Sequence, residues 1–155
     1  MDCRVCRPPT PPTRERFARW RRDSAASALK FLPDDFQAKL NYGIALLNQK
    51  KVVEAEKELT EAVQKNSASS TAHMYLGIAL MSQKKLDEAE KELQLSVAAN
   101  SSEIAVAHKY LGGIYWGKRE YAKAAQELET YLKLAPKAAD ADRIRQSIQE
   151  LKHKQ

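Results

Sequence analysis

Cysteine is scarce in this sequence, and its placement argues against cysteine chemistry. The 155 residues contain two cysteines, Cys3 and Cys6. A structural zinc site needs four ligands, and His73, His108 and His153 lie far from this pair along the chain. A redox Cys-x-x-Cys pair is typical of a strand-to-helix context, whereas this pair precedes a proline-rich run. We therefore favour a chance spacing over a metal or redox site, and we expect no cofactor.

Glycine, proline and long apolar runs are also few. There are five glycines and six prolines, and four of the prolines fall within the first twelve residues. The remainder is rich in Ala, Leu, Lys, Glu and Gln, which favour helices. No apolar run approaches the ~20 residues that cross a bilayer, and no apolar segment of a secretory signal follows the first arginines. We expect a helical chain located, by default, in the cytoplasm.

Motifs of catalysis are missing as well. The sequence has no glycine-rich phosphate loop, no nucleophile elbow and no grouping of His, Cys and Asp. We therefore expect a protein that is not an enzyme.

Positive charge is unevenly distributed. The net charge is +6, but residues 1–30 carry eight Lys or Arg against three acids, and residues 31–155 carry eighteen against seventeen. A nucleic-acid-binding domain usually has its basic stripe on the folded body. The balanced body makes nucleic acid an unlikely partner, although the N-terminal segment is basic.

Internal repetition is the strongest feature of the sequence. Gly-Ile-Ala-Leu occurs at 43–46 and again at 77–80, and Glu-Ala-Glu-Lys-Glu-Leu occurs at 54–59 and again at 88–93, both at an offset of 34. A looser third copy contains Leu111-Gly112, with one extra residue near 101–103. Such a period predicts stacked units that share one core.

Each copy is predicted to form two helices joined by a short turn. In the second copy, Ser70–Ser82 follows a Ser/Thr cluster suited to N-capping, and the polar turn 83–85 follows. The next segment places apolar residues on one face at helical spacing: Leu86, Ala89, Leu93 and Val97.

These units resemble the tetratricopeptide-repeat (TPR) family. The matching features are the period, a large residue followed by Gly at positions 7 and 8, and Ala at position 20 of each unit. The resemblance implies an all-α, right-handed α-solenoid with an N-terminal half-repeat helix and a C-terminal capping helix. We expect a disordered Pro-rich basic leader at 1–13, an N-terminal helix at 14–33, repeats at 36–69, 70–103 and 105–138, and a capping helix at 139–155.

The family resemblance also implies where a partner would bind. In TPR proteins the first helix of each repeat lines a concave groove, and positions 2, 5, 9, 12 and 13 contact ligand. On this sequence the candidate peptide-binding residues are mostly apolar: Leu40, Ile44, Leu47, Asn48, Met74, Ile78, Met81, Lys109 and Trp116. We expect Met74, Ile78, Met81 and Trp116 to form an accessible apolar patch, whereas Leu40 and Leu47 are candidates for packing between first helices.

One known groove chemistry is not expected. TPR domains that bind the acidic C-termini of heat-shock chaperones have Lys at position 5 and Asn at position 9 of the first repeat. Those positions hold Leu40 and Ile44 here. His73 and His108 occupy position 4, which does not usually face the groove, so we interpret them as structural.

Three interpretations of function remain open. The first is a non-catalytic module that binds an apolar peptide or an amphipathic helix of another protein in its groove. The second is a structural unit that forms a homo-oligomer or is one piece of a longer array. The third is attachment of the basic N-terminal arm to nucleic acid or to an acidic surface, which would be strongly salt-dependent.

Overall fold

Seven helices and no strand form the part of the chain that the computed structural model describes, residues 35–98 and 104–154 together with Asp23 and Ser27. The expected leader at 1–13, nearly all of the expected helix at 14–33 and the expected insertion near 101–103 lie outside the described residues. The helices are α2 (Phe36–Asn48), α3 (Val52–Lys65), α4 (Ser70–Ser82), α5 (Leu86–Ala98), α6 (Ile104–Gly117), α7 (Tyr121–Leu134) and α8 (Ala141–Lys152).

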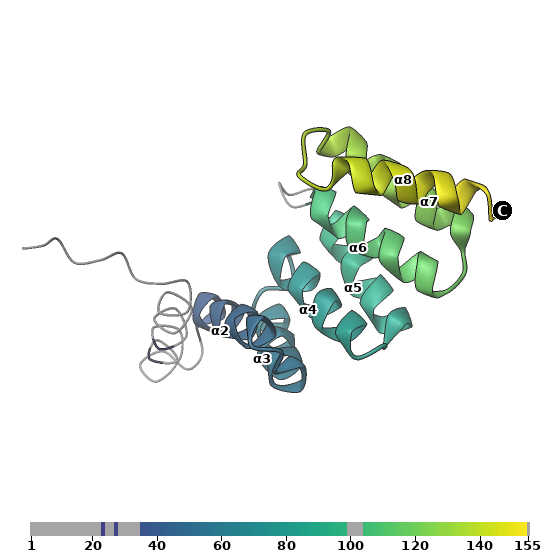
Figure 1. Cartoon of the computed structure of the whole chain (residues 1–155). Helices are drawn as coiled ribbons and strands as arrows, with labels where there is room; N and C mark the ends of the chain where they lie inside the picture. Colours follow the sequence, from purple (N-terminus) through teal and green to yellow (C-terminus); the bar gives the residue numbers. More distant parts are fainter. Residues whose placement is uncertain (1–22, 24–26, 28–34, 99–103, 155) are drawn as a thin grey trace, which may run out of the picture.

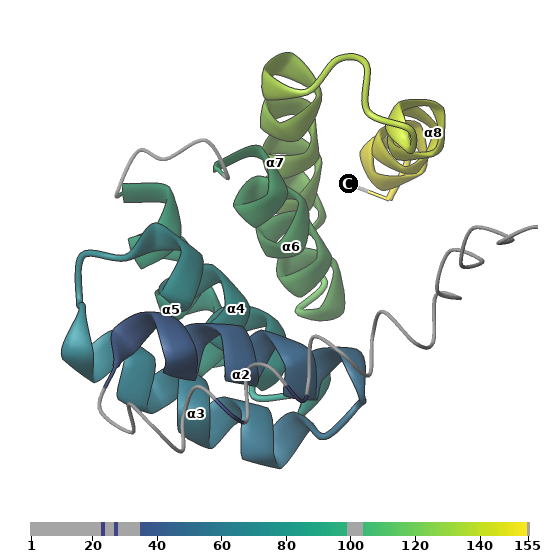
Figure 2. The ribbon, with the colours of Figure 1, turned by 90° about the vertical axis from the view of Figure 1, so that its left-hand side faces the viewer.

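The helices pack as successive pairs in a stack. α2 packs against α3, α4 against α5 and α6 against α7, and each second helix also packs against the first helix of the next pair. α2 touches α4, and α4 touches α6. Figure 1 shows the pairs following one another from α2 to α8, and Figure 2 shows α8 beyond the α6–α7 pair. The all-α helical repeat expected from the sequence is confirmed in these residues.

Glycine and alanine let the two helices of each pair approach closely. A Cβ at Gly43, Gly77 or Gly112 would lie 2.6–2.8 Å from Cγ of a leucine on the paired helix. Those leucines are buried, and the alanines at position 20 have no exposed surface. This dense packing explains why the sequence repeats these residue types: Leu59, Leu93 and Leu128 for leucine, and Ala55, Ala89 and Ala124 for alanine.

The three turns inside the pairs share one backbone geometry. Two residues after the end of each first helix, the turn has a residue of positive φ: Lys50 (62°), Lys84 (64°) and Arg119 (62°). The amide after it donates to the carbonyl five residues back, as in Lys85 N to Leu80 O at 3.0 Å. This is the Schellman motif, in which glycine is the usual residue with positive φ.

The last helix closes the stack with a polar outer face. Ile144, Ile148 and Leu151 are buried, and α8 packs against α7. The exposed positions of α8 are all polar or charged. Such a helix lets a solenoid end in water.

The search for membrane-spanning helices covers the described residues only. None of their helices has both the length and the apolar character needed to cross a bilayer.

Candidate functional site

The first helices α2, α4 and α6 have an unusual composition. They contain no Asp or Glu, and their only basic residues are Lys39, Lys109 and two histidines. Side chains at positions 2, 5, 9, 12 and 13 share one side of each helix, because these positions repeat at three- and four-residue intervals. We call the surface made by these positions on the three helices the first-helix face.

Positions 9 and 12 supply most of the accessible apolar surface on this face. Ile44, Leu47, Ile78 and Met81 are half-buried and pack with one side against the core. Trp116 is 39% exposed, which is a large exposure for an indole. The result is an apolar strip that runs across all three helices. Asn48, Ser82 and Gly117, at position 13, are exposed beside it.

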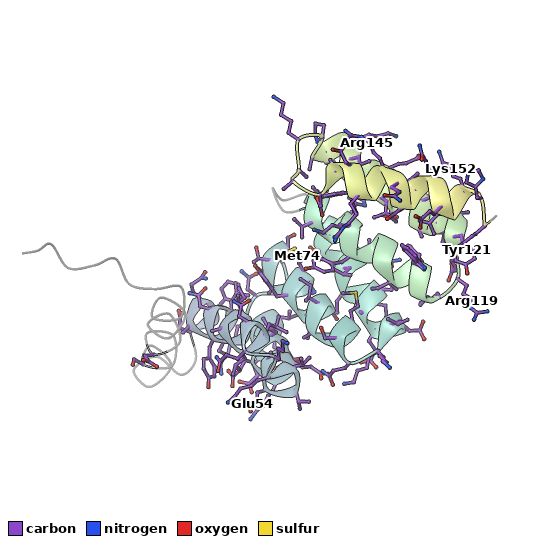
Figure 3. The ribbon with its side chains drawn as sticks, in the orientation of Figure 1. Glu54, Met74, Arg119, Tyr121, Arg145 and Lys152 are labelled. Atoms are coloured by element: carbon purple, nitrogen blue, oxygen red, sulfur yellow. The ribbon has the colours of Figure 1, made fainter. Side chains whose placement is uncertain are left out.

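Position 5 differs from the expectation. Leu40 and Met74 are only 4% and 3% exposed, so neither belongs to the accessible strip. The expected patch of four residues therefore lacks Met74, which is labelled on α4 in Figure 3. We attribute this burial to the contacts of α2 with α4 and of α4 with α6. Of the two packing candidates named from the sequence, Leu40 is buried, whereas Leu47 is only half-buried. The burial of Met74 was not expected.

Lys109, at the third position 5, has different surroundings. No Cα of α8 lies within 8 Å of a Cα of α6, so no following helix covers it as α4 and α6 cover their predecessors. Lys109 Nζ instead lies 3.2 Å from Asp140 Oδ2 and 5.4 Å from the centre of the Tyr131 ring. These three residues, with Ala138, Ala139 and Arg143, line an open hollow of about 530 Å³.

Tyr131 connects this hollow to the end of the stack. The sequence has Tyr here, at position 27, where the family usually has a small residue. Its hydroxyl donates to Asp140 Oδ1 at 2.6 Å. This hydrogen bond, together with burial, raises the pKa of Tyr131 to about 12. The same bond lowers the pKa of Asp140, and Lys109 adds to that lowering.

The two histidines act as structural residues. His73 is buried, with Nδ1 2.7 Å from Glu92 Oε2 and Nε2 3.0 Å from the Ser67 carbonyl. Both ring nitrogens are thus within hydrogen-bond distance of oxygen atoms of the stack. His108 and Glu127 repeat the first contact at 2.5 Å.

The equivalent position of the first pair holds Lys39, whose Nζ lies 2.6 Å from Glu61 Oε2 and 3.9 Å from Glu58. Each pair of helices thus has a tie from position 4 of the first helix to the second helix. No group of three or more His, Cys, Asp or Glu that could hold a metal occurs among the residues described.

A second set of ion pairs joins neighbouring helix pairs. Lys85 Nζ lies 2.8 Å from Glu56 Oε1, and Lys118 Nζ lies 2.5 Å from Asp87 Oδ1 and 2.5 Å from Glu90 Oε2. Burial raises the pKa of Glu90, but hydrogen bonds from Lys118 and Tyr115 outweigh it and hold the pKa below its usual value. These ion pairs link one helix pair to the next, and they occupy the charged ends of Lys85 and Lys118.

The stack of paired helices defines the chain as a helical repeat protein. Models of the tetratricopeptide repeat match residues 16–70 and 46–110. The chain belongs to the tetratricopeptide-repeat family. The search of curated proteins found no match.

Solved structures with the same fold include three of different origin. A MamA protein is 24% identical, with a TM-score of 0.75 over 90% of this chain and 72% of that one. PilF of Pseudomonas aeruginosa is 18% identical, with a TM-score of 0.78 over 89% of this chain and 61% of that one. The first TPR of Spaghetti (RPAP3), bound to the HSP90 peptide SRMEEVD, is 23% identical, with a TM-score of 0.68 over 76% of this chain and 93% of that one. At these identities the likeness concerns the fold.

Proposed function

We propose that the chain is a non-catalytic protein-interaction module whose first-helix face binds an apolar peptide or the apolar side of an amphipathic helix. The observation that carries the proposal is the strip of Ile44, Leu47, Ile78, Met81 and Trp116, which crosses three helices without a carboxylate. The TPR fold is typically a scaffold rather than an enzyme. One neighbour of the same fold was solved with a bound peptide.

The energetics favour an apolar ligand over a polar one. Each half-buried side chain of the strip still exposes apolar surface, and burying such surface stabilises a complex by roughly 25 cal/mol per Å². Trp116 is the natural anchor, because exposed tryptophans often dominate the binding energy of an interface. Met81 adapts its shape to a partner more easily than a branched side chain does.

A chaperone-type carboxylate clamp finds no support in this geometry. Positions 5 and 9 of the first pair hold Leu40, which is buried, and Ile44, which is half-buried. Neither can bind a terminal carboxylate. The peptide class proposed here is therefore different from the SRMEEVD peptide of the Spaghetti structure.

The proposal predicts that a negative charge on the strip weakens peptide binding. The probe is a fluorescein-labelled amphipathic helical peptide with Leu on one side and Gln on the other, called the neutral probe. We expect Trp116→Glu and Met81→Glu to weaken binding at least tenfold in fluorescence anisotropy. The matched control is Val53→Glu, which places the same charge on an apolar residue of α3 that is 72% exposed.

The outcome that contradicts the proposal is equal binding by wild type, Trp116→Glu and Val53→Glu. Light scattering after size exclusion tests the competing structural function on the same proteins. An oligomer of the wild type that becomes a monomer only in Trp116→Glu would show that the strip serves self-assembly instead. Circular dichroism on each variant verifies that the helices are intact.

A further inference from the structure

Three basic residues occupy equivalent positions at the end of the three first helices. Lys50, Lys84 and Arg119 are each the residue of positive φ in the turn, and each is exposed. Within the described part of the chain none of them forms an ion pair, whereas the cations next to them do. Those neighbours pair with acidic residues of the second helices: Lys51 with Glu54, Lys85 with Glu56, and Lys118 with Asp87 and Glu90.

The backbone of each of these three residues is hydrogen-bonded to a residue of the apolar strip. The backbone N–H of Lys50 donates to Leu47 O at 2.9 Å, that of Lys84 to Met81 O at 3.0 Å, and that of Arg119 to Trp116 O at 2.9 Å. Leu47, Met81 and Trp116 are the position-12 residues of the strip. In Figure 1 the first helices end on the same side of the stack, and Figure 3 shows Arg119 projecting from the turn after α6.

Lys154 adds a fourth positive charge at this edge. Its Nζ lies 5.8 Å from the centre of the Trp116 ring and 5.9 Å from that of Tyr121. No acidic residue on α2, α4 or α6 opposes these charges.

A positive φ at these positions carries a cost for any residue other than glycine. The left-handed conformation is unfavourable for an L-residue, and glycine is the usual residue at this place in a helix end. All three turns nevertheless have a cation there. The three turns therefore share a basic residue at a position where the backbone favours glycine.

We propose that Lys50, Lys84 and Arg119 form a basic edge that binds the carboxylate side chains of an amphipathic peptide segment whose apolar side lies on the first-helix face. The inference rests on the proposed function and adds the charge of the ligand to it. The partner segment is acidic along one flank. The balance of eighteen basic and seventeen acidic residues in 31–155 favours this partner over a membrane or nucleic acid, because the free cations form a sparse row rather than a dense patch.

The spacing of the row suggests the design of a probe. Neighbouring packed helices lie about 8–10 Å apart, and seven residues of an α-helix rise about 10.5 Å. A helical peptide with Glu at every seventh position therefore presents carboxylates at roughly the repeat spacing. We call this peptide the acidic probe. It is the neutral probe with Glu in place of Gln at three positions on one flank, and a basic probe has Lys at the same positions.

The test compares the three probes on wild type and on two triple variants. The edge variant is Lys50→Gln, Lys84→Gln, Arg119→Gln. The control variant is Lys57→Gln, Lys91→Gln, Lys133→Gln, which removes the same charge from exposed positions of α3, α5 and α7. Affinities are measured by fluorescence anisotropy at low and at high salt, because exposed charges are screened by salt.

We expect wild type to bind the acidic probe about tenfold more tightly than the neutral probe at low salt, since several exposed ion pairs add modest contributions. The edge variant should lose this preference, and the control variant should retain it. High salt should remove the preference without abolishing binding of the neutral probe.

Two results would overturn the basic edge alone: equal affinity of wild type for the acidic, neutral and basic probes, or an equal loss of preference in both triple variants. The comparison of probes on wild type needs no variant to fold. Failure of all three probes to bind would overturn the proposed function and this inference with it. Binding of wild type to phosphatidylserine vesicles that the edge variant loses, with acidic-probe affinity unchanged, would assign the cations to a membrane surface and contradict the proposal.

Discussion

At the scale of single residues, two adjacent glycines in α6 have opposite environments. A Cβ at Gly112 would lie 2.8 Å from Leu128 Cγ, whereas a Cβ at Gly113 would meet no atom within 4 Å. Gly112 is buried against α7, and Gly113 is exposed on the first-helix face. The identity of the residue alone does not distinguish the two, but their positions in the repeat do.

This difference predicts opposite effects of the same substitution. Gly112→Ala should lower the free energy of unfolding by about 1–3 kcal/mol, because it overpacks a close helix crossing. Gly113→Ala should raise it by up to about 1 kcal/mol, because alanine favours the helix. Urea denaturation of both variants and wild type measures the effects. Equal effects of the two substitutions would contradict this description of the crossing.

Residues in the core of a repeat could be predicted from the sequence, whereas residues between repeats could not. The alanines at position 20 and the glycines at position 8 follow from the period alone. The burial of Met74 depends on how closely α4 and α6 approach each other, which no local pattern encodes. The free cations were also missed, although a basic residue at the same turn position in three copies is visible in the sequence.

At the scale of elements, the first helices α2 and α4 are bounded by local signals that the sequence displays. At the start of α2 the side chain of Asp35 accepts a hydrogen bond from the backbone N–H of Ala38, and at the start of α4 that of Ser69 accepts one from Ala72. The predicted helix at Ser70–Ser82 and the turn at 83–85 agree with the structure. Position 4 ties, such as His73 with Glu92, could not be predicted, because they join residues on different helices.

One of the contacts at the start of α8 is a hydrogen bond that titrates. The Tyr131 hydroxyl binds Asp140, which precedes the first residue of α8, and the pKa of Tyr131 rises from 10.0 to about 12. Because the protonated phenol is the form that the fold favours, this contribution is complete below pH 10 and is lost as the pH rises toward about 12. The lowered pKa of Asp140 adds a second loss, as the pH falls below 3.8.

Tyr131→Phe should therefore lower the free energy of unfolding at neutral pH. The difference in this free energy between the variant and wild type should become smaller at strongly acidic and at strongly alkaline pH. The measurement is the free energy of unfolding of both proteins from acid to alkaline pH. The control is Tyr110→Phe, because the Tyr110 hydroxyl has no hydrogen-bond partner among the residues described. A difference between wild type and Tyr131→Phe that stays constant above pH 10 would contradict the assigned hydrogen bond.

At the scale of the whole molecule, the proposed function depends on the alignment of three similar helices. No single pair of helices presents more than two residues of the strip, so stacking is what creates an extended apolar surface. The same stacking brings the turn cations to one edge. A solenoid of this kind behaves as a linear array in which each repeat adds one unit of binding surface.

The repeat architecture could be predicted from the sequence because it depends on periodicity. Which residues are accessible on the first-helix face could be predicted from the sequence only in part. At position 5, Leu40 and Met74 are buried, whereas Lys109 pairs with Asp140. The difference arises because α8 lies farther from α6 than α6 lies from α4. Such spacing is a property of the assembled stack.

The central claim is that the first-helix face is the surface that binds a peptide, and the most direct test is a nuclear magnetic resonance titration. Isotope-labelled protein is titrated with the neutral probe, and changes in backbone amide shifts are mapped on the helices. We predict that the changes concentrate on α2, α4 and α6 and include the indole N–H of Trp116. Changes that concentrate on α3, α5 and α7, or no changes at all, would contradict the claim.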